Sequence, residues 1–222
     1  MPRIARQVFP NIPHHITQRG NRREDVFFHD DDKQLYLEWL TDYCLKHQVT
    51  ILAYCLMDNH IHLVLIPETA DGLQKVLKPL HMRYAQYINK QHGWTGHLWQ
   101  GRFFSSALDE PHTYSAIRYV ERNPVEAGMV EKAEDYPWSS AAHHCGLVTN
   151  DALSNRANSV VDIPESDWSS WLAIAEDKMI TDVLERNVEK GLPCGNDSFI
   201  DRLEQLANCS LRYRPQGRPV KK

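Results

Sequence analysis

Residues 49–67 read VTILAYCLMDNHIHLVLIP, and this stretch decides the fold. Two runs rich in β-branched and apolar residues, 49–57 and 60–67, are typical of buried strands. The pair Asp58 and Asn59 between the two runs favours a turn. The stretch therefore predicts a β-hairpin of two buried strands at the centre of a sheet.

The second strand of this hairpin carries a His-x-His motif. Side chains two residues apart on a strand face the same side, with Cα atoms about 7 Å apart. His60 and His62 therefore share one face, while the other face holds the apolar residues Ile61, Leu63 and Leu65. Two neighbouring imidazoles on a rigid strand can chelate one divalent ion. A pair of exposed or hydrogen-bonded histidines is the alternative.

The segments around the hairpin complete a mixed pattern of helices and strands. We predict strands over residues 13–19 and 102–108, helices over 30–48 and 69–92, and a helix from 110 that Pro124 ends. The order strand, helix, strand, strand, helix, strand is the ferredoxin-like split βαβ arrangement, followed by one more helix. We therefore expect an α+β fold: a ferredoxin-like sheet with helices on one face, plus a C-terminal helical extension.

Residues after position 147 differ in character from those before it. All 12 histidines lie between His14 and His144. A polar connection and two predicted helices follow, and the end of the chain is basic and contains prolines. We therefore divide the chain into a domain over residues 1–147, a mostly helical extension over 148–207 and a basic flexible tail over 208–222.

The charges are distributed unevenly along the chain. The formal net charge is −4 and the pI is about 6.3, which taken alone argues against a polyanionic partner. Residues 1–23 and 205–222, however, each hold five basic residues and no acidic ones, whereas the middle holds 15 basic and 29 acidic residues. The two basic ends are compatible with DNA binding, and also with simple solubilising termini.

Cysteine spacing and hydropathy restrict the location of the protein. The five cysteines are widely spaced and form no CxxC motif, so we expect neither a disulfide framework nor a cysteine-type zinc site. The longest purely apolar run, residues 51–57, is too short for a membrane span or a signal peptide. These features predict a cytoplasmic protein without membrane contact.

A tyrosine and an asparagine lie at helical spacing on the helix predicted from residue 110. Tyr119 and Asn123 are four residues apart and share a helix face, beside Arg118 and Arg122. A tyrosine hydroxyl that faces arginines and an amide is a candidate nucleophile toward a phosphate. A boundary tyrosine with an ordinary hydrogen bond is the alternative. Close to a metal held by the histidine pair, such a tyrosine would suit an anionic substrate.

Four motifs together resemble the HUH transposases, which carry a histidine-hydrophobic-histidine motif and one catalytic tyrosine. The motifs are MDNHIHLV at 57–64, YVERNPV at 119–125, HITQRGN at 15–21 and DYPWSS at 135–140. The resemblance covers about residues 3–147. With its extension and basic tail, the chain is most similar to the REP-associated tyrosine transposases, bacterial relatives of the small insertion-sequence transposases.

The resemblance implies a mechanism and a set of site residues. Tyr119 would attack a phosphate in single-stranded DNA, form a 5′-phosphotyrosine link and free a 3′-hydroxyl that can later rejoin strands. His60 and His62 would bind Mg²⁺ or Mn²⁺, with Asn123 as the candidate third ligand. The resemblance also implies palindromic hairpin (REP) DNA as the partner and a monomer as the acting form, with a dimer as the alternative.

DNA binding should depend on cations for the phosphates and on aromatic faces for unstacked bases. We expect contacts from arginines of the first strand, of the region near the site and of the tail, namely Arg19, Arg22, Arg23, Arg83, Arg102, Arg118, Arg122, Arg212, Arg214 and Arg218. Trp99, Phe103 and Phe104 are candidates for stacking, with a place in the core as the alternative. The basic tail could follow the phosphates or cover the site in the absence of DNA.

Two other functions are compatible with parts of the sequence. A DNA-binding regulator derived from a transposase would bind hairpins without cutting them, although His60, His62 and Tyr119 together favour the enzyme. An unrelated metal-dependent hydrolase would use the His-x-His motif, but it would leave the tyrosine helix and the basic ends unexplained.

Overall fold

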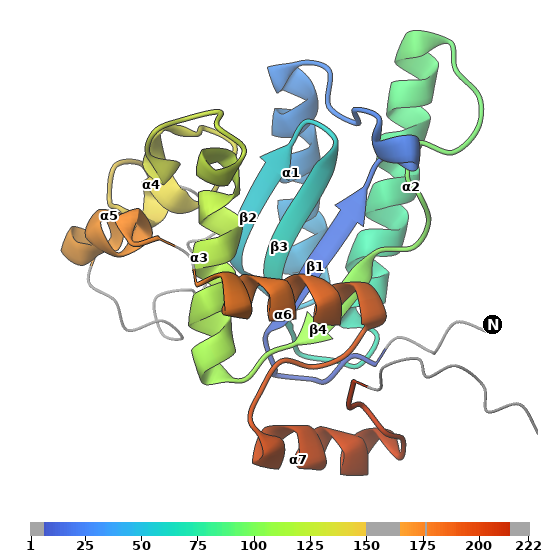
Figure 1. Cartoon of the computed structure of the whole chain (residues 1–222). Helices are drawn as coiled ribbons and strands as arrows, with labels where there is room; N and C mark the ends of the chain where they lie inside the picture. The colour runs from blue at the N-terminus through green and yellow to red at the C-terminus, as the bar shows by residue number, and fades with distance from the viewer. Residues whose placement is uncertain (1–6, 150–164, 176, 214–222) are drawn as a thin grey trace, which may run out of the picture.

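A four-stranded antiparallel sheet forms the centre of the computed structural model, which describes residues 7–149, 165–175 and 177–213. The strands run in the order β2-β3-β1-β4 (Figure 1) and are β1 (His14–Arg19), β2 (Val49–Met57), β3 (His60–Pro67) and β4 (Phe104–Ala107). This is the order of a ferredoxin-like split βαβ unit, because β3 lies between β1 and β2. The predicted hairpin and the α+β class are therefore confirmed. The hairpin is not central as a whole, because β2 is an edge strand whose outer side pairs with residues 138–140.

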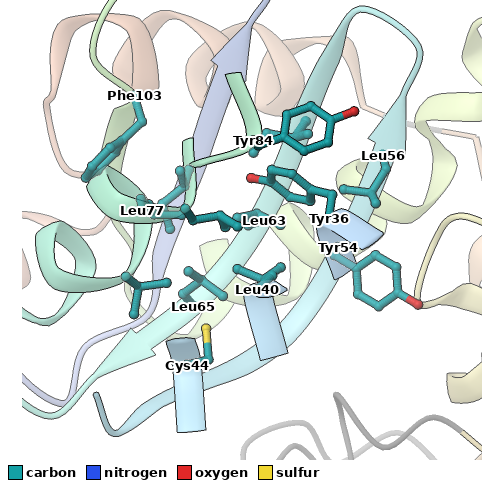
Figure 2. Packing of buried hydrophobic residues seen from close by; sticks show 14 of the residues in the cluster. Tyr36, Leu40, Cys44, Tyr54, Leu56, Leu63, Leu65, Leu77, Tyr84 and Phe103 are labelled. Carbon is teal, nitrogen blue, oxygen red and sulfur yellow. The ribbon is translucent and has the colours of Figure 1, made fainter. Parts of the chain in front are cut away.

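Helices α1 (Asp30–Lys46) and α2 (Gly72–His92) cover one face of the sheet (Figure 1). Their buried side chains pack on the apolar residues of β3 in the main core, as Figure 2 shows for Leu40, Leu63 and Leu77. Each fully buried leucine contributes about 2 kcal/mol of hydrophobic stabilisation. This core also sets the register, because a slip by one residue would turn Leu63 outward and bring the histidines inward.

Helix α3 (Glu110–Glu126) packs on the opposite face of the sheet, mainly against β2. Its buried residues Ala116, Ile117 and Val120 form the predicted apolar stripe and join a second core cluster. The expectation of helices on one face therefore holds for α1 and α2, whereas α3 lies on the other face. This is the face that His60 and His62 share, so the packing of α3 brings the tyrosine helix to the histidine pair.

Helix α3 extends past the point where we predicted its end. Pro124 lies inside the helix, which ends at Glu126, and Gly128 follows with a left-handed φ of 69°. The prediction was wrong because a proline near the end of a helix removes only one backbone hydrogen bond, while the turn around it is held by others. One of these is the bond from Ala127 N to Asn123 O, at 3.0 Å.

A buried carboxylate connects α3 to the segments that follow it. Glu121 is fully buried and accepts hydrogen bonds from Ser140 Oγ, His144 Nδ1 and Trp168 Nε1 at 2.5, 2.5 and 2.8 Å. After the short helix η2 (Ala133–Asp135), Ser140 is the N-cap of helix α4 (Ala141–His144), which contains His144, and Trp168 belongs to helix α5 (Glu165–Ala173). Because the donors come from α4 with its N-cap and from α5, the network holds both helices against α3.

The C-terminal extension docks on the outer edge of β4. Helix α6 (Lys178–Lys190) lies across the same face of the sheet as α3, and α7 (Asp197–Ala207) follows it (Figure 1). Between them, Cys194 N donates to Ala107 O at 2.8 Å and Asp109 N donates to Cys194 O at 3.0 Å. The segment between α6 and α7 therefore extends the edge of the sheet and fixes the extension to it.

The predicted tail begins as part of this packed extension. Leu211 is buried and Arg212 forms ion pairs with Asp197 and Asp201 of α7. The start of the tail was therefore placed too early, because these contacts hold residues 208–213 against α7. Residues 214–222 lie outside the described part of the chain. Among the described residues, no helix combines the length and the hydrophobicity needed to span a bilayer.

Candidate active site

A cavity of about 410 Å³ lies between the sheet and helices α3 and α6. Its lining includes the four residues predicted as nucleophile and metal ligands, namely His60, His62, Tyr119 and Asn123. A larger cavity, of about 660 Å³, lies between the start of α3 and α7 and contains none of them. The smaller cavity is therefore the candidate active site, because chemistry depends on the groups that converge and not on volume.

His60 is held at the rim of the cavity by two asparagines. Its Nδ1 lies 2.5 Å from Asn59 Oδ1, and its side chain also hydrogen-bonds Asn123 of α3. Burial, together with the nearby Arg19, lowers the pKa of His60 to about 4. The imidazole is therefore neutral at pH 7, which is the form that binds a metal.

His62 lies deeper in the cavity and contacts a third histidine. Its Nδ1 is 3.1 Å from Nε2 of His15, and the two rings are stacked with centroids 5.4 Å apart. Burial, followed by the nearby His60 and His15, lowers the pKa of His62 well below its usual value. Burial lowers the pKa of His15 to about 3. Sequence reasoning missed His15, although the alternation of β1 places it on the same face as Thr17 and Arg19.

The donor groups of the cavity fit a divalent ion that is only partly coordinated by protein. Both imidazoles are neutral at pH 7 and each has a partner at Nδ1, a contact that commonly leaves Nε2 to the metal. Asn123 hydrogen-bonds His60, so its amide lies within reach of the same ion. Among the described residues, no group of three or more His, Cys, Asp or Glu could hold a metal. Remaining ligands would therefore come from water or substrate.

Tyr119 lies between the histidines and the C-terminal extension. Its ring meets the rings of His62 and His15 edge-on, with centroids 5.4 and 5.7 Å apart. Its hydroxyl donates a hydrogen bond to Oε1 of Glu185, at 3.0 Å. Glu185 belongs to α6 and also lines the cavity. Sequence reasoning missed this carboxylate, because no local pattern relates a residue of α6 to a residue of α3.

Two predicted DNA-binding arginines line the cavity on the β1 side. They are Arg19 at the end of β1, which is paired with His60 across the sheet, and Arg23 of the short helix η1 (Asn21–Arg23). Arg22 and Arg23 have φ angles of 55° and 66°, a region that side chains rarely adopt. The turn is fixed by close packing at Gly20, where an added Cβ would lie 2.1 Å from Glu24 O. Such strain persists only where the surrounding structure imposes it, and it is common at functional sites.

Three other predicted arginines are engaged elsewhere. The guanidinium of Arg83 lies 3.8 Å from the ring centre of Trp39, between α2 and α1 on the opposite face of the sheet. Arg122 is buried and donates to Leu172 O and to Glu126. Arg212 is paired with aspartates of α7. We predicted DNA contacts from Arg83 and Arg122 on elements close to the site. In the structure Arg83 packs on the far face of the sheet, and Arg122 connects α3 to α5.

The remaining predicted contacts have mixed positions. Arg102 is exposed in the loop before β4, and Arg118 lies over the ring of Trp171, 5.6 Å from its centre. Trp99 and Phe103 belong to the main core, which is the alternative that the sequence left open, whereas Phe104 lines the cavity. Arg214 and Arg218 lie outside the described residues.

Three comparisons with known proteins agree with these features. A family model for IS200-like transposases matches residues 8–123. A curated protein of Haemophilus influenzae named as a REP-associated tyrosine transposase is 27% identical, and the match covers 59% of this chain and 84% of that protein. The solved structure of a REP-associated tyrosine transposase bound to a REP hairpin has a TM-score of 0.57 and 20% identity, and the match covers 73% of this chain and 95% of that chain. The structural match establishes a shared fold.

Proposed function

Because the chain belongs to the IS200-like transposase family, we propose that it cleaves and rejoins single-stranded DNA at palindromic hairpins, with Tyr119 as the nucleophile. The observation that supports this proposal best is the position of Tyr119, whose ring lies 5.4 Å from that of His62 in a cavity shared with His60 and Asn123. A nucleophile, candidate metal ligands and arginines thus converge in one place. Because one chain supplies all of them, the proposed acting form is a monomer.

Tyr119 is proposed to attack a phosphorus atom of the DNA backbone. Its oxygen forms a bond to phosphorus while the bond from phosphorus to the 3′-oxygen breaks, which leaves a 5′-phosphotyrosine and a free 3′-hydroxyl. The new bond resembles the one that is lost, so a 3′-hydroxyl can reverse the step and rejoin strands without ATP. A tyrosine has an ordinary pKa of about 10, so attack at neutral pH requires help from its surroundings.

The other residues of the cavity would bind and orient the phosphate. A divalent ion such as Mg²⁺ or Mn²⁺, held by His60, His62 and Asn123, would polarise a phosphate oxygen. Arg19 and Arg23 line the same cavity and would neutralise phosphates beside the reacting one. Phe104 offers a ring to an unstacked base. The hairpin in the related solved structure supports hairpin DNA as the substrate class.

A covalent adduct tests the proposal directly. The protein is incubated with hairpin oligonucleotides that carry single-stranded flanks, in Mg²⁺ or Mn²⁺, and denatured samples are examined for DNA-linked protein. We expect an adduct with the native chain and none with Tyr119→Phe, while Tyr114→Phe on the same helix serves as the matched control. Hairpin binding without an adduct under all ions and sequences would instead support a regulator that does not cut. An adduct that survives Tyr119→Phe would disprove the assignment of the nucleophile.

A further inference from the structure

The hydrogen bond between Tyr119 and Glu185 joins the proposed nucleophile to the C-terminal extension. We propose that Glu185 is the general base that takes the proton of Tyr119 as it attacks, an inference that rests on the function proposed above. The two oxygens are 3.0 Å apart, with the hydroxyl as donor and Oε1 as acceptor. A base must lie about 2.6–3.2 Å from the group it deprotonates, so the geometry is already that of proton transfer.

The need for a base follows from the chemistry of tyrosine. With an ordinary pKa of about 10, only about one tyrosine in a thousand is ionised at pH 7. The three histidines nearest to the site have other roles, since His60 and His62 are the proposed metal ligands and Nε2 of His15 lies 3.1 Å from Nδ1 of His62. A carboxylate that already accepts the hydroxyl hydrogen is the better candidate.

Helix α6 holds Glu185 in a defined position. Leu184 is fully buried and Val188 is nearly so, and both lie on the side of α6 that packs on the rest of the protein. Asn187 donates to Pro193 O at 2.8 Å and thereby holds the end of the helix against the segment that docks on β4. A base carried by an anchored helix costs little to orient at the moment of reaction.

The charges around Glu185 allow its role to be separated from a general field effect. Glu189, one turn further along α6, lines the same cavity, and Arg19, Arg23, His15, His60 and His62 face it from the sheet side. If Glu185 only repelled the phosphate by its charge, its removal would have the same effect as removal of the charge of Glu189. A base must instead be the residue in contact with the hydroxyl.

The proposed step balances in both directions. In cleavage, the Tyr119 proton moves to Glu185, the bond from the tyrosine oxygen to phosphorus forms, the bond to the 3′-oxygen breaks, and that oxygen takes a proton from solvent. Glu185 then returns its own proton to solvent. In rejoining, the 3′-hydroxyl loses its proton to solvent as it attacks, and a protonated Glu185 returns a proton to the leaving tyrosine oxygen.

The test compares Glu185→Gln with Glu189→Gln in single-turnover adduct formation from pH 6 to pH 9. At pH 7 we expect Glu185→Gln to lose about 10²- to 10⁴-fold in rate, the usual contribution of general base catalysis. The deficit should shrink as pH rises, because hydroxide and ionised tyrosine replace the missing base. Glu189→Gln should keep the pH profile of the native chain. Hairpin affinity, measured for each variant, should stay within a few fold of native and reports that the site is still folded.

Failure of the proposed function and failure of the base assignment give different results. If the native chain forms no adduct at all, the proposed function is wrong, and the assignment of Glu185 as its base is wrong too. If the native chain forms an adduct and Glu185→Gln reacts at the same rate or faster, the function stands and the base assignment is overturned. An equal loss at every pH would also overturn it, since it would mean that Glu185 only positions the tyrosine.

Discussion

Nε2 of His15 lies 3.1 Å from Nδ1 of His62, in a contact between two buried imidazoles. Only one of the two nitrogens can carry the shared hydrogen, because both rings are neutral. If His62 donates, its Nε2 is free for a metal, and His15 must then carry its own hydrogen on Nδ1. That Nδ1 has no hydrogen-bond partner among the described residues. The metal-binding form of His62 therefore requires the tautomer of His15 in which a buried N–H has no hydrogen-bond partner in the described part of the chain.

Replacing His15 should weaken metal binding without removing a ligand. His15→Leu keeps the buried volume but removes the acceptor for His62 Nδ1, so we expect Mn²⁺ affinity to fall by about 10- to 100-fold, as for other partners of metal-bound histidines. Calorimetric titration of the protein with Mn²⁺ measures the change. The control is His14→Leu, because His14 is equally buried but bonds only to backbone groups of Phe9 and Ile12. An equal loss of affinity in both variants would contradict the prediction.

Buried neutral histidines should make the fold sensitive to acid. Burial lowers the pKa of His14 to about 4, of His15 to about 3 and of His60 to about 4, from an ordinary value of 6.5. Below pH 6.5 these histidines bind protons in the unfolded chain but stay neutral in the folded chain. Their contribution to the free energy of unfolding is therefore complete above pH 6.5 and is lost as the pH falls toward 4. Each histidine contributes a loss of up to about 1.4 kcal/mol per pH unit. Urea unfolding at pH 7, 6 and 5 measures it, and His14→Leu should show a shallower loss.

Arginines of the cavity and of the far face should differ in their effect on DNA binding. Arg23→Gln should reduce the dependence of hairpin affinity on salt by about 0.7 to 0.9 in the slope of log K against log salt, the value for one lost phosphate contact. Arg83→Gln should leave the slope unchanged, because Arg83 stacks on Trp39 on the other side of the sheet. Filter binding or fluorescence anisotropy at salt concentrations from about 50 to about 300 mM gives both slopes. A larger change with Arg83→Gln would place DNA on the α1 and α2 face.

The buried carboxylate beneath α3 should be important for stability. Glu121→Gln replaces one acceptor oxygen with an NH₂ group in a site where Ser140, His144 and Trp168 all donate. We expect a loss of about 3 kcal/mol in the free energy of unfolding, because at least one buried donor loses its partner. Urea unfolding measures the loss. Glu126→Gln, at an exposed position, should cost less than about 1 kcal/mol. Equal effects would mean that the network does not support α3.

Local spacing in the sequence determined the hairpin, the order of elements and the pairing of residues on each element. The period of two on β3 put His60 and His62 on one face, and the period of the helix put Tyr119 beside Asn123. These relationships need only neighbouring residues, so they can be recognised without knowing how the chain folds back. The resemblance to a transposase family then related the two pairs to each other.

The tertiary structure decided which residues complete the site. Helix α3 faces the histidines because it packs on the opposite side of the sheet from α1 and α2, and α6 adds Glu185 because the extension docks on the edge of β4. The same packing buries Arg122 and removes Arg83 from the site. Contacts between distant segments depend on which apolar faces fit together, and residue spacing within one segment carries no information about that choice.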